Sequence, residues 1–316
     1  MGFIGSRLAS DLSAKGDAVR IVDAAVTRND DGQYLRVDVR DRHALAASID
    51  GSDVIYSLAA VHRDDIKPAS LYDEVNVLGA VNLCDACREL GILRIVFTSS
   101  VAVYSLVADE LSEDSTTEPS SAYGSSKLRA EQVYRDWQAE EPNSRSLVIV
   151  RPTVVFGEGN RGNVYQLFRQ IWSRRFVMVG NGRNRKSMAY VGNVSAFLVH
   201  VLGLGAGVHT FNYVDGPDLS MEELVDTILI AFGRQPKLKV RIPYVFGYLI
   251  GVVCDAVAAA SNRRLPISAA RIRKFRSTTT FSAQRTKSIG FQPPTSLREA
   301  LLKTIKHEFF GSARSD

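Results

Sequence analysis

The sequence predicts an α/β fold in which a doubly wound parallel sheet is followed by a smaller α/β lobe. Short apolar strands alternate with helical patterns through the first half of the chain, as they do in βαβ units. Two glycines, Gly2 and Gly5, open the first helical pattern, and the next strand ends in Asp23. A glycine turn at a helix start, followed by an acidic strand end, is typical of the Rossmann-type sheet.

The predicted strands are short and apolar, at 19–23, 34–39, 54–60, 94–100 and 146–152. The third strand has the sequence VIYSLAA, which favours a central place in the sheet. Helical spacing covers 71–90 and 121–139, and Gly91 is a suitable residue to end the first of these helices. With 316 residues, we place the first domain at 1–152, with later returns near 187–213, and the substrate-binding lobe mainly at 153–316.

The chain starts inside the glycine turn, with no strand before it. The doubly wound fold places its first strand and the first glycine of the turn ahead of this point. We therefore expect that the first strand is missing from this sequence and that Met1 is an internal start or a truncation point.

The composition of the chain narrows the range of possible functions. Hydrophobic residues make up 45% of the chain, enough for a packed core, and three cysteines are too few for a disulfide framework. We therefore expect a protein of the reducing cytoplasm. The net charge of +5 fits an anionic small molecule, and no pattern of aromatic and basic residues predicts nucleic-acid binding. Cys84 and Cys87 have no second pair of ligands, so we expect core packing and no metal.

One apolar segment, 242–254, is too short to span a bilayer and runs into Asp255. We interpret it as a buried helix of the second lobe, with contact to a membrane surface as the alternative. No integral membrane span is expected.

The glycine turn predicts a dinucleotide site. Glycines let a pyrophosphate approach the backbone at a helix N-terminus, and Asp23 can accept hydrogen bonds from both ribose hydroxyls. Because Asp23 would repel a 2′-phosphate, the expected cofactor is NAD rather than NADP.

The catalytic prediction rests on Tyr123 and Lys127, four residues apart and therefore on one helix face. A nearby ammonium lowers the pKa of a tyrosine, which makes it a usable general base. Ser99 and Ser100 end a strand that precedes this helix, and a serine there can hold the substrate oxygen. This set suits hydride transfer at a carbinol carbon.

These motifs resemble the extended short-chain dehydrogenase/reductases, specifically the NAD-dependent epimerase/dehydratase family that modifies nucleotide sugars. The resemblance runs along essentially the whole chain, in GFIGSRL at 2–8, VDVRD at 37–41, NVLGAVNL at 76–83, FTSSVAVY at 97–104, YGSSK at 123–127, RPTVVFG at 151–157 and KSMAYVGNV at 186–194.

The resemblance implies roles for individual residues. Ser100, Tyr123 and Lys127 are catalytic. The cofactor contacts are Gly2, Phe3, Ile4, Gly5, Asp23, Asp38, Val39, Leu58, Ala59, Ala60, Asn76, Ser99, Tyr123, Lys127 and Pro152. The substrate contacts are Ser100, Asn163, Lys186, Arg271 and Arg273, with Arg185 as a neighbour that could replace Lys186. The helices at 71–90 and 121–139 imply a homodimer.

The expected reaction is 4-epimerisation of a nucleotide sugar through a 4-keto intermediate, in the synthesis of a surface-polysaccharide precursor. Many such epimerases carry an asparagine where this chain has Val154, which keeps a 4-keto-sugar reductase open. A 3β-hydroxysteroid-type dehydrogenase and a non-catalytic NAD-binding protein are the remaining alternatives.

Overall fold

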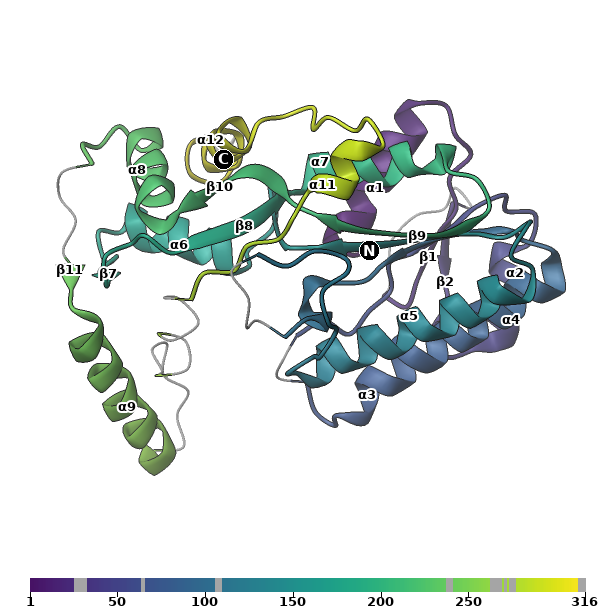
Figure 1. The fold of residues 1–316 in the computed structure, drawn as a ribbon, viewed down its shortest axis with the longest axis horizontal. Helices are drawn as coiled ribbons and strands as arrows, with labels where there is room; N and C mark the ends of the chain where they lie inside the picture. Colours follow the sequence, from purple (N-terminus) through teal and green to yellow (C-terminus); the bar gives the residue numbers. More distant parts are fainter. Residues whose placement is uncertain are drawn as a thin grey trace, which may run out of the picture. The chain divides into compact units, whose positions relative to one another are not determined.

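The computed structural model describes residues 1–25, 33–63, 66–105, 110–236, 241–261, 269, 272 and 277–311 (Figure 1). Arg271 and Arg273 therefore lie outside the described residues. The chain divides into two compact units. Unit 1 comprises Met1–Val155, Ala189–Val214 and Phe281–Thr295, and unit 2 comprises Phe156–Met188, Asp215–Thr280 and Ser296–Asp316.

Four parallel strands form the main sheet of unit 1, in the order β3-β4-β5-β9. They are β3 (Ile55–Ser57), β4 (Arg94–Thr98), β5 (Ser146–Pro152) and β9 (Gly207–Tyr213). A separate parallel pair is made by β1 (Ile21–Asp23) and β2 (Tyr34–Arg36). Within the described ranges no strand pairs with both β1 and β3. These two strands are only half-buried, whereas β5 is buried along its whole length.

Helices cover both faces of the sheet, as predicted, because successive side chains of β4 and β5 point to opposite faces. Ile95, Phe97, Leu147 and Ile149 belong to one buried cluster, and Val96, Val148 and Val150 belong to another. The first cluster is completed by α2 (Arg42–Ile49), α4 (Gly79–Leu90) and α5 (Ala122–Glu140). The second is completed by α1 (Phe3–Ala14) and α7 (Val191–His200).

The helix predicted at 71–90 is interrupted. It consists of α3 (Ser70–Tyr72), a π-helical turn η1 (Asp73–Leu78) and α4, and it ends at Gly91 in the left-handed conformation with φ 66°. Short 3₁₀ turns follow β4 at η2 (Val101–Val103) and α7 at η3 (Val201–Gly203), and α11 (Gln284–Ser288) completes unit 1.

Unit 2 contains an antiparallel pair, β8 (Arg185–Tyr190) with β10 (Asp215–Ser220), and a short parallel pair, β7 (Met178–Val179) with β11 (Arg241–Ile242). The chain enters it along β6 (Val154–Phe156). Its helical elements are α6 (Asn163–Trp172), α8 (Met221–Ala231), α9 (Tyr244–Ser261), α12 (Leu297–Ile305) and η4 (Lys306–Phe310). Trp172 and Phe232 contact Phe309 and Phe310, so aromatic packing holds α6, the end of α8 and η4 together.

We predicted a buried helix at 242–254, and this prediction is wrong for one face of the helix, which is exposed. Residues 241–242 form β11, and the helix α9 begins at Tyr244. Gly247 and Gly251 are buried, whereas Val245, Phe246 and other apolar side chains of α9 are exposed. Among the helices that the structure describes, none combines the length and the hydropathy needed to cross a bilayer.

Cys84 and Cys87 lie on α4 and point into the core, as predicted. Burial raises the pKa of both thiols, that of Cys87 to about 12. Cys254, on α9, is partly exposed.

Gly124 permits a close approach between α5 and η2, and this contact generates a prediction. A Cβ at this position would lie 2.1 Å from the carbonyl oxygen of Ala102. Gly124→Ala should therefore lower the free energy of unfolding by about 1–3 kcal/mol, measured by denaturant titration. Gly203→Ala is the matched control because a Cβ there has no neighbour within 4 Å. Equal unfolding midpoints for the two variants would contradict the contact.

Candidate active site

The start of α5 carries the two residues that the sequence singles out for catalysis. The Ser121 hydroxyl accepts a hydrogen bond from the amide of Gly124 at 3.0 Å and caps the helix. Tyr123 lies in the first turn and is half-buried, and Lys127 lies one turn later on the same face with a side chain that is 2% exposed. Capping and periodicity thus place the phenol of Tyr123 and the buried amine of Lys127 on one face of α5.

Lys127 lies over an aromatic ring, with its Nζ 4.4 Å from the centre of the Phe97 ring. Burial lowers the pKa of Lys127 to about 7, against the charge of Glu131, which raises it. The amine therefore changes charge near neutral pH. A protonated lysine stabilises a phenolate close to it, and a phenolate is the form that a general base requires.

Ser100 is the N-cap residue of η2, two residues after the end of β4. Its hydroxyl accepts a hydrogen bond from the amide of Ala102 at 3.1 Å, and its side chain is partly exposed. Because Gly124 lets the Ala102 carbonyl approach the first turn of α5, Ser100 and Tyr123 belong to neighbouring segments of unit 1. This is the arrangement expected for a serine that holds the oxygen on which a tyrosine acts.

Ser99 behaves differently from Ser100. Its hydroxyl donates to Glu131 at 2.6 Å, inside the protein, and the residue is 2% exposed. The structure thus directs the Ser99 side chain into the core, while Ser100, one residue later, is the serine whose side chain reaches the surface.

Sequence reasoning missed a buried network behind these residues. Glu131 pairs with Arg151 at 2.5 Å, and the Arg151 guanidinium also donates to the hydroxyl of Tyr104 at 2.7 Å. That hydroxyl donates to Asn212 at 2.8 Å. Burial acts to lower the pKa of Arg151, but hydrogen bonds and charge from Glu131 outweigh it and raise the pKa. The signal in the sequence was an acid four residues after Lys127, on the same helix face.

The N-terminus of α1 fits a dinucleotide phosphate. Gly2 is the N-cap residue, no side chain caps the helix, and its first turn contains no acidic residue. The first amides of a helix have no partner within it and are available to an anion. A Cβ built at Gly5 would lie 3.5 Å from the Leu58 side chain, whereas a Cβ built at Gly2 would have no atom within 4 Å. Gly2 is exposed, and Phe3, Ile4 and Gly5 are partly exposed.

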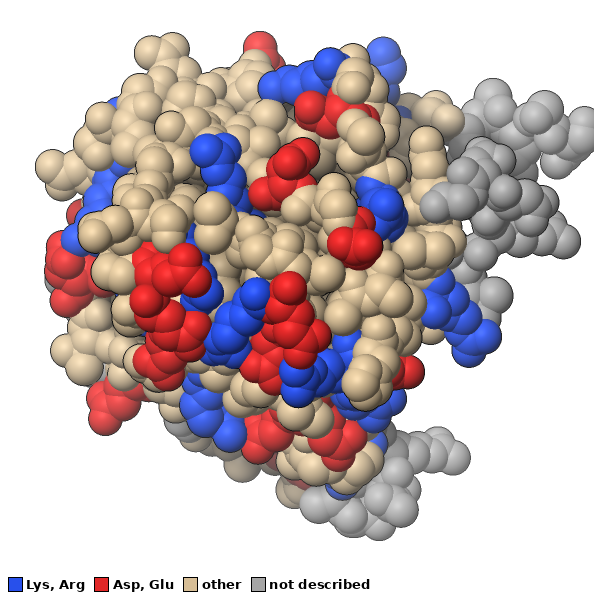
Figure 2. All heavy atoms as spheres, turned by 90° about the vertical axis from the view of Figure 1, so that its right-hand side faces the viewer, with Lys and Arg blue, Asp and Glu red and all other residues tan. Residues whose placement is uncertain are grey.

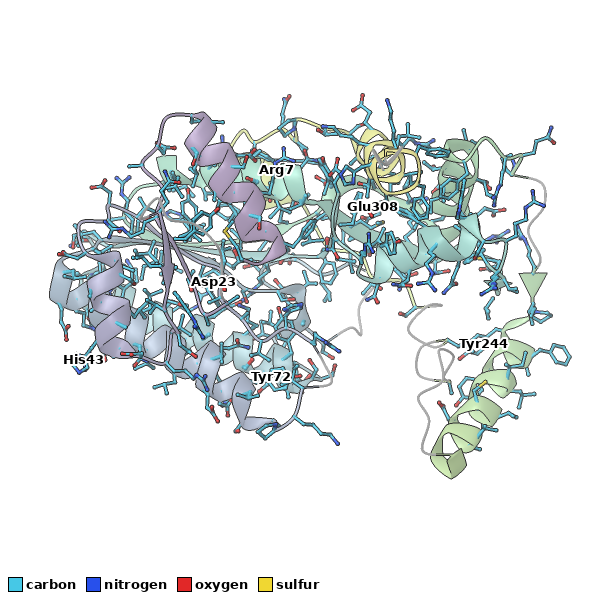
Figure 3. The ribbon with its side chains drawn as sticks, turned by 180° about the vertical axis from the view of Figure 1, so that it is seen from behind. Arg7, Asp23, His43, Tyr72, Tyr244 and Glu308 are labelled. Carbon is cyan, nitrogen blue, oxygen red and sulfur yellow. The ribbon has the colours of Figure 1, made fainter. Side chains whose placement is uncertain are left out.

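Asp23 ends β1 and is labelled in Figure 3 with Arg7 of α1. One carboxylate oxygen of Asp23 accepts a hydrogen bond from the amide of Ala25 at 2.8 Å, and the other lies 3.7 Å from the amino group of Met1. The carboxylate is thus held at the end of the strand that follows α1. This position suits recognition of a ribose.

The other predicted cofactor residues follow strands of unit 1. Asp38 is paired with Arg40, whose hydrogen bonds lower the pKa of the carboxyl group. The neighbouring Val39 fits against Gly79, where a Cβ would lie 2.7 Å from its side chain. Leu58, Ala59 and Ala60 come directly after β3, and Pro152 ends β5 opposite Tyr213 of β9.

Asn76 links three segments. Its side chain exchanges two hydrogen bonds with the backbone of Val61, at 2.8 and 3.0 Å, and donates to the Ser126 hydroxyl at 2.8 Å. It therefore fixes the loop after β3 against α5. This places Asn76 in the wall of the predicted cofactor site as a residue that positions the loop.

Apart from Ser100, which belongs to unit 1, the predicted substrate residues that the structure describes belong to unit 2. Lys186, on β8, donates to Thr279 at 2.7 Å, and Arg185 is exposed, 3.8 Å from Glu223. Asn163 is exposed at the first position of α6.

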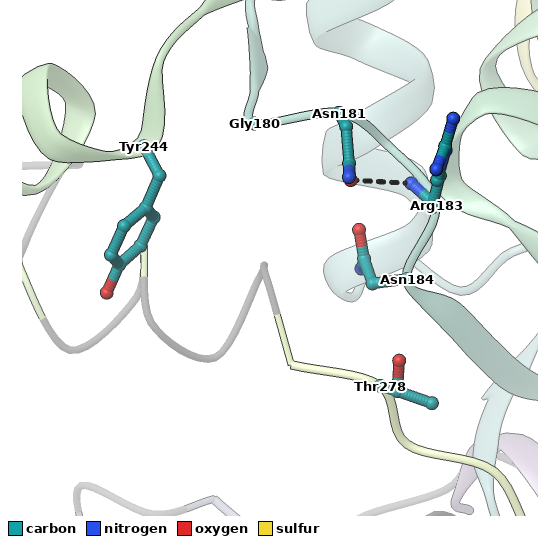
Figure 4. Close-up of a pocket in the computed structure, with 6 residues that line it drawn as sticks. All are labelled: Gly180, Asn181, Arg183, Asn184, Tyr244 and Thr278. Carbon is teal, nitrogen blue, oxygen red and sulfur yellow. Dashed lines mark hydrogen bonds between the residues drawn. The ribbon is translucent and has the colours of Figure 1, made fainter.

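A cavity of about 310 Å³ lies near these residues in the chain, lined by Gly180, Asn181, Arg183, Asn184, Tyr244 and Thr278 (Figure 4). The Asn181 side chain accepts from the amide of Arg183 at 3.1 Å. The sequence analysis did not single out Arg183. A guanidinium, two amides and two hydroxyls in one cavity suit an anionic or sugar-bearing group.

Comparison with known proteins agrees with this geometry. Residues 1–213 match the model of the NAD dependent epimerase/dehydratase family. The chain is 43% identical to N-acetyl-alpha-D-glucosaminyl-diphospho-ditrans,octacis-undecaprenol 4-epimerase of Escherichia coli O157:H7. This match extends over 281 residues and covers 88% of this chain and 84% of that protein. It is 28% identical to UDP-glucose 4-epimerase of Vibrio cholerae, over 96% and 92% of the two chains.

Among solved structures, MoeE5 in complex with UDP-glucuronic acid and NAD superimposes with a TM-score of 0.76. It is 26% identical to this chain, and the match covers 97% of this chain and 95% of that one.

The lowered pKa of Lys127 predicts how stability depends on pH. Below pH 7 the folded and unfolded states both hold the proton. Between pH 7 and the ordinary lysine pKa of about 10.4, only the unfolded state holds it, so stability rises with pH. Denaturant titrations should show a gain of about 2 kcal/mol from pH 7 to pH 9 relative to Lys127→Met. Parallel profiles for the two proteins would show that Lys127 keeps an ordinary pKa.

Proposed function

The chain belongs to the NAD-dependent epimerase/dehydratase family, and on that premise we propose that it inverts C4 of a sugar carried on a diphosphate. Membership makes it an NAD-dependent enzyme of the extended short-chain dehydrogenase/reductase type, as the motifs predicted. The observation that carries the proposal is the buried Lys127 one helical turn after Tyr123, together with Ser100 at the start of η2.

The reaction needs a proton acceptor at one substrate oxygen. NAD, when bound, takes a hydride from C4 and returns it. Tyr123 removes the proton of the C4 hydroxyl as C4 becomes a carbonyl, and Ser100 holds that oxygen by a hydrogen bond. Once the 4-keto sugar has rotated to present its opposite face, Tyr123 returns the proton to the C4 oxygen. Lys127 supplies the positive charge that keeps Tyr123 ionised before the first step and again after the second. The cofactor is unchanged overall.

For the substrate, we propose an N-acetylhexosamine linked through diphosphate to a polyprenol, in the synthesis of a surface polysaccharide. The relative whose name describes this substrate is 43% identical over most of both chains. A nucleotide sugar is the second candidate, favoured by the 28% identity to a UDP-glucose 4-epimerase over nearly the whole of both chains. Both substrates present a sugar on a diphosphate, and Arg183 and Lys186 provide cations in unit 2.

We also propose that the protein acts as a homodimer in the cytoplasm. Two apolar residues support the dimer, because Leu78 is 44% exposed and Val81 is 36% exposed at the start of α4. Cys84, Cys87 and Cys254 are all unpaired thiols, which supports a reducing compartment.

Replacing Tyr123 by Phe tests the chemistry. Loss of the proton acceptor should reduce 4-epimerisation at least about 100-fold, measured by separating the two epimers after incubation with NAD. The assay is run with N-acetylglucosaminyl-diphospho-undecaprenol and, separately, with UDP-N-acetylglucosamine. Tyr34→Phe, which removes a hydroxyl from β2, is the matched control.

Three outcomes decide the proposal. Turnover of the polyprenol-linked sugar by wild-type protein and its loss in Tyr123→Phe supports it. Turnover of the nucleotide sugar alone shows that the second candidate is the substrate. Net oxidation of NADH by a 4-keto sugar, without epimer exchange, shows that the enzyme is a reductase instead.

The dimer is tested by substitution on α4. Leu78→Ser combined with Val81→Ser should reduce the molar mass in solution from that of two chains to that of one, because exposed apolar contact area drives association. Light scattering after size-exclusion chromatography measures this mass, with Leu302→Ser, on the exposed side of α12, as the control. An unchanged mass in the double variant places the interface elsewhere.

A further inference from the structure

Helix α9 has one exposed apolar face. Its exposed side chains are Val245, Phe246, Leu249, Ile250, Val252, Val253 and Val257, and they are between 43% and 64% exposed. At 100° per residue these positions fall on one side of the helix. Seven large apolar side chains on one helix face form a continuous surface of the kind that marks an interaction site.

The opposite face of α9 packs against unit 2. A Cβ at Gly247 would lie 2.7 Å from the Val179 side chain, and one at Gly251 would lie 2.7 Å from the amide of Ala269. The Asp255 carboxylate accepts a hydrogen bond from that same amide at 3.0 Å. The glycines therefore fix which side of α9 faces the protein, so the apolar side is presented outward by the packing itself.

The charge of the surrounding sequence indicates what could cover this face. Residues 227–280 include ten Lys or Arg and a single acid, Asp255, although the whole chain carries only +5. On the face shown in Figure 2, by contrast, basic and acidic side chains are interspersed. A basic chain segment that contains an apolar helix is complementary to an anionic bilayer surface, because basic residues attract the headgroups while apolar side chains enter the acyl region.

Two tyrosines support the same partner. Tyr244 and Tyr248 lie one turn apart at the start of α9, with ring centres 5.9 Å apart, and both are partly buried. Tyrosine is favoured at the boundary between lipid and water. Tyr244 also lines the polar cavity that contains Arg183 (Figure 4), so the first turn of α9 is shared between the apolar face and that cavity.

We propose that α9 is a membrane-docking helix that lies in the surface of an anionic phospholipid bilayer through its exposed apolar face. The helix lies along the surface and does not cross it. Docking brings the cavity lined by Tyr244 to the level of the headgroups. The proposal rests on the face and the charge around it and is independent of which sugar the enzyme epimerises.

Co-flotation of the full-length chain with lipid vesicles tests the docking helix, without substrate. The vesicles are two-thirds phosphatidylethanolamine and one-third phosphatidylglycerol, and phosphatidylcholine vesicles serve as the neutral comparison. Wild-type protein should float with the anionic vesicles and less with the neutral ones. Phe246→Ser combined with Val253→Ser should reduce the floating fraction about tenfold, since both side chains are at the centre of the exposed face.

The matched control is Ile230→Ser combined with Leu302→Ser, which removes two exposed apolar side chains from other helices of unit 2. It should float like wild type, and both double variants should keep the wild-type Tm. Equal flotation of the two double variants would overturn the proposal, as would failure of wild type to float. A lower molar mass of Phe246→Ser/Val253→Ser in solution would also overturn it, because the face would then be covered by a second copy. None of these results depends on epimerase activity.

Discussion

A buried carboxylate, Glu131, determines how helix α5 sits on the sheet. It lies in the interior, pairs with Arg151 of β5 and accepts the hydroxyl of Ser99 at the end of β4. An unpaired charge in such a position would cost several kcal/mol, so these three groups must stay together. Because Glu131 lies one turn after Lys127 on α5, the same contact fixes the buried amine over Phe97 and its distance from the strand ends.

The negative charge also has an electrostatic effect. A lysine that is 2% exposed loses its proton easily, and Glu131 opposes that loss. Without this opposition, Lys127 would be neutral over more of the physiological range and would stabilise a phenolate at Tyr123 less well. Gly124 and Asn76 act on the same helix from other sides, one by permitting the approach of η2 and the other by linking Ser126 to the loop after β3. The helix is thus positioned from its core side and from its flanks.

Local patterns predicted the parts of the structure that depend on local geometry. The strand β5, the end of a helix at Gly91 and the shared face of Tyr123 and Lys127 follow from periodicity and turn chemistry, and the comparisons confirm the family and the cofactor. The pairing of Glu131 with Arg151 could not be predicted, because it depends on which strand lies beneath α5. The outward face of α9 was only an alternative for a similar reason, since its apolar pattern suits a buried helix equally well. The π-helical turn at 73–78 likewise gave no sequence signal.

The three cysteines differ in a way that makes the protein easy to label. Cys84 and Cys87 are enclosed in the core, and burial disfavours the thiolate that reacts with maleimides and iodoacetamides. Cys254 is partly exposed and lies in the middle of α9. A thiol-reactive fluorophore added to the unmodified chain would therefore attach at this helix first, without any engineered cysteine. Its emission would report the polarity around α9 directly.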